Sequence, residues 1–172
     1  MDMKTASPLD LLQDPSLLKT DALINGQWVA GAARFDVLDP ATGLKLADVA
    51  NLGAAEAQAA IAAADAAWAA WRGKTAKERS TILRKWYDLL MAHQDDLGRI
   101  MTAEQGKPLA EAKGEVAYGA SFVEWFAEEA KRVNGETLPH FDNNRRLMVL
   151  KQPIGVCAAI TPWNFPLAMI TR

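Results

Sequence analysis

The stretch Gly155-Val-Cys-Ala-Ala-Ile-Thr-Pro-Trp-Asn-Phe-Pro166 decides the fold class of this sequence. Its first half, 155–160, is a short continuous apolar run, which favours a strand buried on both faces, although periodicity alone also fits a piece of buried helix. Pro162 and Pro166 then break the run, since proline cannot donate to a strand ladder and suits the first turn of a helix. The pattern predicts an α/β fold with a turn at the carboxyl end of a strand, where ligands bind in open α/β sheets.

Residues 54–134 are expected to form four helices. In the first, which Gly73 ends, Trp68 and Trp71 continue an apolar stripe at three- and four-residue steps and are expected to face the core. The second is expected to start at a capping box, the third to end at a glycine, and the fourth to start at a proline and end at an Asn-Gly pair. These signals are Thr75 with Glu78, Gly106, Pro108, and Asn134-Gly135.

Short strands are expected on both sides of the helices. Asn25-Gly26 is the two-residue signal of a type I′ hairpin, and the turn 39–43 separates two further strand candidates, 35–38 and 44–49. Residues 146–152 form another candidate, which follows a polar loop and ends at Pro153. An unpaired strand exposes a row of N–H and C=O groups and favours association with another chain.

Composition excludes several classes of function. The 172 residues are 50% apolar with a formal net charge of −2, which suits one ordinary core and does not indicate nucleic-acid binding. Because no apolar run is long enough to cross a membrane and residues 1–20 lack a basic targeting segment, we expect a cytoplasmic protein. Cys157 is the single cysteine, and His93 and His140 lie far apart, so neither a disulfide within the chain nor a metal site is expected.

The run Glu104-Gln-Gly-Lys-Pro108 contains glycine and lysine but is not a phosphate loop. It lacks the G-x-x-x-x-G-K-[ST] spacing, and its glycine does not lie between a strand and a helix. The sequence also contains no G-x-G-x-x-G, which argues against an autonomous dinucleotide site. We expect this run to be a helix end followed by a proline restart.

On spacing alone, Thr161–Pro166 would be a proline-rich loop with a buried Trp. Together with Thr75-Ala-Lys-Glu-Arg-Ser80, the 104–108 run and Phe122-Val-Glu-Trp-Phe-Ala-Glu-Glu129, however, it resembles the aldehyde dehydrogenase superfamily, most of all its succinate-semialdehyde branch. The resemblance extends over 22–172. It implies the N-terminal part of that family's fold: edge hairpin strands, four helices, a bridging strand and the first strand of a Rossmann-like cofactor domain, which is incomplete here.

The resemblance also implies a division of the chain into four parts. Residues 1–20 would be a poorly ordered lead, and 21–145 the helical part of the cofactor domain with its edge strands. Residues 146–153 would be a strand that bridges subunits of a homo-oligomer. The last part, 154–172, would hold the first strand and turn of the cofactor domain.

The same resemblance assigns roles to four residues near the end of the chain. Asn164 would donate a hydrogen bond to the oxyanion formed when a cysteine thiolate attacks the aldehyde. Thr161 and Trp163, with Asn164, would line the site for NAD or NADP. Arg172, otherwise a solvated charge, would bind the distal carboxylate of a small aldehyde substrate, which a guanidinium fork suits geometrically.

The chemistry that the resemblance implies needs more groups than these. Covalent oxidation of an aldehyde requires a cysteine thiolate, a base, an oxyanion donor and a bound nicotinamide cofactor. Cys157 lies inside the apolar run, where a desolvated thiol behaves as a small hydrophobe, so we do not expect it to be the nucleophile. We therefore expect the 172-residue chain alone to be inactive, with weak or no cofactor binding. The alternative is a non-catalytic helical module that associates with full-length subunits through 146–152.

Overall fold

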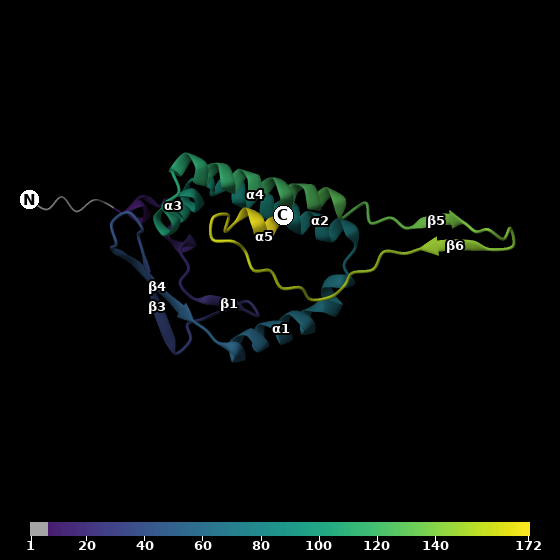
Figure 1. Cartoon of the computed structure of the whole chain (residues 1–172), viewed down its shortest axis with the longest axis horizontal. Coiled ribbons are helices and arrows are strands. Elements are labelled where there is room, and N and C mark those ends of the chain that lie inside the picture. Colours follow the sequence, from purple (N-terminus) through teal and green to yellow (C-terminus); the bar gives the residue numbers. More distant parts are fainter. Residues whose placement is uncertain (1–6) are drawn as a thin grey trace, which may run out of the picture.

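The computed structural model describes residues 7–172. Its α-helices are α1 (Ala54–Arg72), α2 (Ala76–Ala92), α3 (Gln94–Gln105), α4 (Leu109–Glu129) and α5 (Ala168–Thr171), and two 3-10 helices, η1 (Pro8–Leu11) and η2 (Pro15–Leu17), precede them. The strands are β1 (Ala22–Ile24), β2 (Gln27–Val29), β3 (Ala33–Leu38), β4 (Lys45–Asn51), β5 (Glu136–Pro139) and β6 (Arg146–Val149). They pair as antiparallel hairpins, β1 with β2, β3 with β4, and β5 with β6. Figure 1 shows α2, α3 and α4 packed together, α1 set apart from them, and the β5–β6 hairpin projecting outward.

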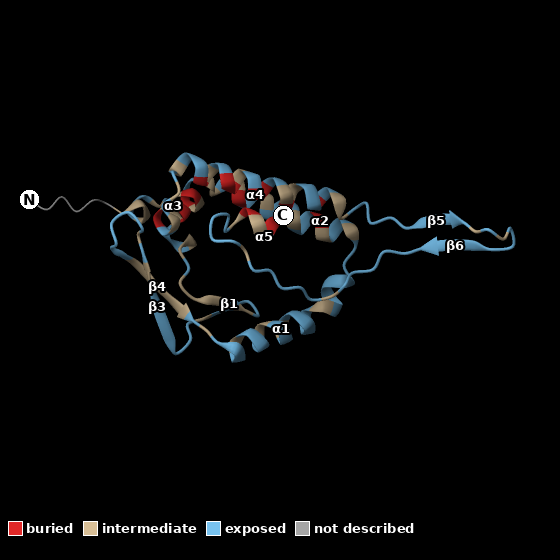
Figure 2. Ribbon diagram, in the orientation of Figure 1, coloured by how far each residue is buried: buried red, intermediate tan, exposed pale blue. Residues whose placement is uncertain are grey.

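The core lies along one face of α4. An apolar stripe of α4 is buried there (Figure 2), and it packs against Leu90 of α2, Met101 of α3 and Leu167 just before α5. Its buried members are Ala112, Val116, Ala120, Val123 and Ala127. The three long helices and α5 therefore form the part of the chain that supports the 161–167 turn.

The signals that start and end the helices behave largely as predicted. The Thr75 hydroxyl accepts from the N–H of Glu78, whose carboxylate accepts in return from the N–H of Thr75, which completes the capping box of α2. Gly106, at φ 78°, ends α3 in the left-handed conformation. The fourth helix ends at Glu129, before the predicted Asn134-Gly135 stop, because its last residues turn more tightly through i, i+3 hydrogen bonds.

The prediction that Trp68 and Trp71 are core residues is wrong for the described chain. Within residues 7–172, α1 buries none of its residues, and Trp71 and Ile61 keep 38% and 59% of their surface exposed. The helix forms because its alanine-rich sequence favours helix. It lies apart from α2–α4 (Figure 1), so its apolar stripe has no core to enter.

The lead is more ordered than predicted over 7–20. Two short 3-10 turns form there, and the N–H groups of Gln13 and Asp14 donate to the carboxylate of Asp96 on α3, at 2.9 and 2.8 Å. Hydrogen bonds to a distant side chain therefore fix this segment. The rest of the predicted lead, 1–6, lies outside the described residues.

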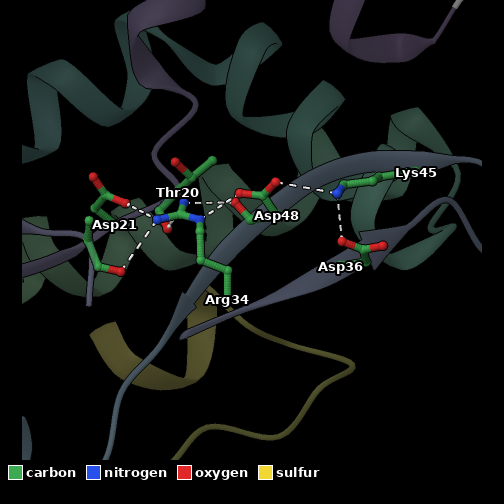
Figure 3. A network of polar contacts seen from close by, with 7 residues as sticks. Thr20, Asp21, Arg34, Asp36, Lys45 and Asp48 are labelled. Carbon is green, nitrogen blue, oxygen red and sulfur yellow. Dashed lines mark hydrogen bonds and ion pairs between the residues drawn. The ribbon is translucent and has the colours of Figure 1, made fainter. Parts of the chain in front are cut away.

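The N-terminal hairpins are joined by charged side chains. Asn25 and Gly26 have φ values of 50° and 73°, which confirms the type I′ turn. Arg34 of β3 donates to Asp21 at 2.8 Å, to the Thr20 carbonyl at 3.2 Å and to the Asp48 carboxylate at 2.5 Å (Figure 3). Hydrogen bonds to Asp21 and then Asp48 raise the pKa of Arg34. This network attaches the segment before β1 to the β3–β4 hairpin.

Two strand predictions need correction. Residues 146–149 do form a strand, β6, but its partner β5 lies in the segment predicted to be a polar loop. The run 155–160 does not pair as a strand within residues 7–172, and Ile160 lies fully exposed. A strand needs a neighbouring edge to bond with, and the described chain places none beside this run. Among residues 7–172, no helix is long and apolar enough to cross a membrane.

Candidate functional site

The predicted site turn is held against α4 by the short helix that follows it. The Phe165 N–H donates to the Pro162 carbonyl at 3.4 Å, and the Met169 N–H donates to the Phe165 carbonyl at 3.3 Å. The chain then enters α5, close to the helix start that Pro166 predicted. Gly119 of α4 allows this approach, since a Cβ at that position would overlap Leu167 and lie 3.3 Å from the Cα of Ala168.

A cleft of about 630 Å³ opens between this turn and the junction of α3 with α4. The turn contributes Trp163, Asn164 and Phe165 to its wall. The opposite wall comes from the end of α3, the junction and the first turns of α4. Its residues are Gln105, Gly106, Lys107, Pro108, Glu111, Gly114, Glu115 and Tyr118.

Side chains of the α3–α4 junction hold the backbone of the turn. The Gln105 amide nitrogen donates to the carbonyl of Trp163 at 2.8 Å. The Lys107 ammonium group donates to the carbonyl of Asn164, also at 2.8 Å, and lies 4.4 Å from the centroid of the Phe165 ring. Two consecutive carbonyls are thus fixed by side chains far away in sequence.

Glu115 connects this junction to α5. Its side chain is 1% exposed and forms an ion pair with Lys107. Its other oxygen accepts from the N–H groups of Leu167 and Ala168, at 3.0 and 3.2 Å. Buried carboxylates persist only where charge and hydrogen bonds compensate for lost water, and Glu115 has both.

Neither Lys107 nor Glu115 was predicted as a functional residue. The 104–108 run was interpreted only as a helix end and restart. One signal was nevertheless present: Glu115 occupies a position in the buried stripe of α4, next to Val116 and three residues after Ala112. A carboxylate at a core position of a helix indicates a partner elsewhere in the fold.

Of the predicted site residues, the structure places Trp163 and Asn164 in the cleft. Trp163 is 80% exposed and Thr161, two residues earlier, is half-buried outside the cleft wall. Arg172 follows α5, and its guanidinium carbon lies 6.0 Å from the centroid of the Phe122 ring. Phe122 in turn packs edge-on against Tyr118, with 4.8 Å between ring centroids. Arg172 is therefore separated from the cleft by one aromatic pair.

Cys157 lies outside this cleft. The prediction that it is buried in a strand is wrong, because the unpaired 155–160 run leaves its side chain exposed. Its thiol makes a weak contact with the carbonyl of Gly155 at 3.6 Å. Cys157 is not among the residues that line the cleft beside Asn164.

The residues present do not make a complete dinucleotide site. A helix N-terminus can bind a phosphate through its free N–H groups, but the N–H groups that start α5 already donate to Glu115. The turn offers one hydroxyl, one indole and one amide, which suits one end of a cofactor and leaves its pyrophosphate without a partner. Among residues 7–172, no three His, Cys, Asp or Glu side chains gather as metal ligands would.

Comparison with known proteins agrees with the resemblance found in the sequence. The pattern of the aldehyde dehydrogenase family matches residues 28–172. The NADP(+) succinate-semialdehyde dehydrogenase of Escherichia coli (strain K12) is 61% identical over 163 residues, which cover 94% of this chain and 34% of that protein. The 3-sulfolactaldehyde dehydrogenase of Pseudomonas putida is 58% identical with the same coverage of both chains, 94% and 34%.

A solved structure gives the same picture. The crystal structure of succinate-semialdehyde dehydrogenase from Burkholderia pseudomallei superposes with a TM-score of 0.90 at 64% identity, over 94% of this chain and 34% of that one. The chain thus spans about a third of the length of the relatives it matches. It matches their N-terminal part, which confirms the predicted fold class. This chain belongs to the aldehyde dehydrogenase family.

Proposed function

We propose that this chain is the N-terminal part of an enzyme that oxidises a small aldehyde bearing an anionic group, succinate semialdehyde above all, with NAD+ or NADP+. The proposal rests on the position of Asn164. This residue lines the cleft, and Lys107 of the α3–α4 junction holds its main-chain carbonyl. The 61% identity to an NADP(+) succinate-semialdehyde dehydrogenase supports the substrate and the cofactor class.

In this proposal Asn164 is the oxyanion donor. Attack of a thiolate on an aldehyde places negative charge on the carbonyl oxygen, and a donor already in position stabilises that charge without reorganisation. An asparagine amide supplies two N–H donors and carries no charge of its own. Such a donor therefore favours the charged intermediate more than the neutral aldehyde.

Arg172 is the proposed carboxylate-binding residue. Its guanidinium carbon lies 6.0 Å from the centroid of the Phe122 ring, and Phe122 packs against Tyr118 of the cleft wall. A distal carboxylate would meet it while the aldehyde end lies near Asn164. The names of both curated relatives denote aldehydes with an anionic group, a carboxylate in one and a sulfonate in the other, and an arginine suits either.

Thr161 and Trp163 are proposed to line one end of the cofactor site in the whole enzyme. A bound cofactor would supply the hydride acceptor, and these residues would line its nicotinamide site. The strand within 146–153, which pairs with β5 in the β5–β6 hairpin, is the proposed bridge between subunits of a homo-oligomer. Residues 21–145 and 154–172 would both belong to the cofactor domain.

The 172-residue chain by itself is proposed to be inactive, because its single cysteine lies outside the cleft. Purified chain supplied with succinate semialdehyde and NADP+ should produce no NADPH. Turnover that disappears in Cys157→Ser would overturn this part of the proposal.

The decisive experiment is a chimera. Residues 1–172 replace the matching third of the E. coli relative, and NADPH production from succinate semialdehyde is measured. We expect an active chimera in which Asn164→Ala lowers kcat about a hundredfold or more, the usual cost of removing an oxyanion donor. Tyr118→Phe is the matched control in the cleft wall, because it removes a polar group that has no role in the proposed chemistry. An inactive chimera, or an unchanged kcat in Asn164→Ala, would contradict the proposal.

A further inference from the structure

We infer that Lys107 and Glu115 are positioning residues, which set the place of Asn164 and so control how well it stabilises the oxyanion. The inference rests on the proposed function of Asn164. The buried ion pair between Lys107 of the α3–α4 junction and Glu115 of α4 would therefore affect catalysis.

The backbone of Asn164 is held in place, whereas its side chain is not. Within the described residues its side-chain amide makes no hydrogen bond, so the amide is free to donate to a ligand. Its direction is then set by its own backbone. That backbone is held through its carbonyl by Lys107 at 2.8 Å, and the preceding carbonyl is held by Gln105 at 2.8 Å.

Glu115 acts on both sides of Asn164. One carboxylate oxygen pairs with Lys107, which holds the carbonyl of Asn164. The other oxygen accepts from the N–H groups of Leu167 and Ala168, just after the turn. A single carboxylate thus fixes the chain before and after the Phe165–Pro166 bend.

The ion pair between Lys107 and Glu115 is shielded from water. The side chains of Lys107 and Glu115 are 12% and 1% exposed. Ion pairs in such surroundings are screened little by water and salt, and the loss of one partner leaves an uncompensated charge. Lys107 is also oriented by the Phe165 ring beneath it, so its ammonium group has little freedom to move elsewhere.

A displaced donor has a measurable consequence. Shifts of about 1 Å in a reacting group cost on the order of a hundredfold in rate. In the chimera described above, Lys107→Met keeps an unbranched apolar side chain, one atom shorter than that of lysine, and removes the ammonium group. We expect this variant to lower kcat about tenfold to a hundredfold, with the KM values for aldehyde and NADP+ nearly unchanged.

The test is a double-mutant cycle between Lys107 and Asn164, because positioning and general stabilisation give different results in it. If Lys107 acts through Asn164, then Lys107→Met has almost no further effect on kcat in an Asn164→Ala background. Equal losses in both backgrounds, or a loss confined to KM, would overturn the inference. Lys107→Arg, which keeps the charge, should recover part of the lost kcat.

Lys113→Met is the matched control. Lys113 lies on α4, as Glu115 does, and pairs with Asp95 at 2.6 Å, but its side chain is 34% exposed and it is not among the residues that line the cleft. We expect its kcat to equal that of the unsubstituted chimera. If Lys113→Met lowered kcat as much as Lys107→Met does, the loss of any ion pair with α4 would be enough to reduce kcat, and the inference would fail.

Thermal unfolding identifies variants that do not fold. If Lys107→Met is one of them, Lys107→Arg is measured in the same cycle, with the same criterion of a smaller effect beside Asn164→Ala. The two proposals fail separately. An unchanged kcat in Asn164→Ala contradicts the oxyanion role, whereas a large loss in Asn164→Ala with none in the folded Lys107 variants contradicts the positioning role alone.

Discussion

The carboxylate of Asp96 accepts a hydrogen bond from the main-chain N–H of Gln13, 83 residues earlier in the sequence, at 2.9 Å. Its second oxygen accepts from the N–H of Asp14 at 2.8 Å. These two bonds hold the pKa of Asp96 below its ordinary value. Asp96 is 3% exposed. This residue in the first turn of α3 therefore also anchors the segment before β1.

Docking of the 7–20 segment should depend on pH through Asp96. Because the folded state lowers this pKa below 3.8, the carboxylate stabilises docking fully above that pH, and the stabilisation is lost as the pH falls through the folded value. Amide hydrogen exchange of Gln13 and Asp14 measures the docking. Asp96→Asn should speed their exchange at neutral pH by about tenfold or more, as expected on losing bonds to a charged acceptor. Asp95→Asn, on the same turn, should leave both amides protected, and equal exchange in the two variants would contradict the prediction.

The contact of Gly119 with α5 should limit what this position can hold. Gly119→Ala places a methyl group against Leu167 and 3.2 Å from the Thr171 hydroxyl, so we expect a loss of about 1–3 kcal/mol in the free energy of unfolding. Gly114→Ala is the control, since a Cβ there meets nothing within 4 Å. Removing a helix glycine at that open position should stabilise the chain by about 0.5–1 kcal/mol. Urea unfolding measures both, and a neutral Gly119→Ala would show that α5 is not packed as described.

The sequence predicted local structure well where a few neighbouring residues determine it. The Asn25-Gly26 turn, the Thr75 capping box and the end of α3 at Gly106 each follow from backbone preferences that need no distant partner.

What the sequence did not predict depends on contacts between distant residues. The apolar stripe predicts core positions for Trp68 and Trp71, because it indicates that this helix face prefers burial. It does not reveal which element covers that face. The 155–160 run was assigned to a strand although pairing requires a neighbour that periodicity does not reveal. At the site, Asn164 came from a resemblance, whereas Lys107 and Glu115 became visible only when the fold placed them beside it.

The capping box of α2 provides a local test of stability. Thr75→Ala removes the hydroxyl that accepts from the Glu78 N–H, and we expect it to cost about 1 kcal/mol in the free energy of unfolding. Thr81→Ala, at an exposed position inside the same helix, should be neutral or slightly stabilising because alanine favours helix more than threonine does. Thermal unfolding of the two variants should therefore shift in different directions, and equal shifts would contradict a capping role.

Arg172 gives a prediction about substrate choice. In the active chimera, Arg172→Met should raise KM for succinate semialdehyde about tenfold to a hundredfold, because a hydrogen bond to a charged group contributes about 1.5–3 kcal/mol. KM for butanal, which has the same carbon chain and no carboxylate, should change little, because it has no group for the guanidinium to bind. Lys131→Met removes an equal charge at an exposed pair with Glu128 and should affect neither substrate. If Arg172→Met raises KM for both aldehydes equally, the Arg172 side chain supports the aromatic pair Tyr118–Phe122 and does not bind the carboxylate. A selective loss would instead place the distal end of the substrate beyond that pair, at the end of α5.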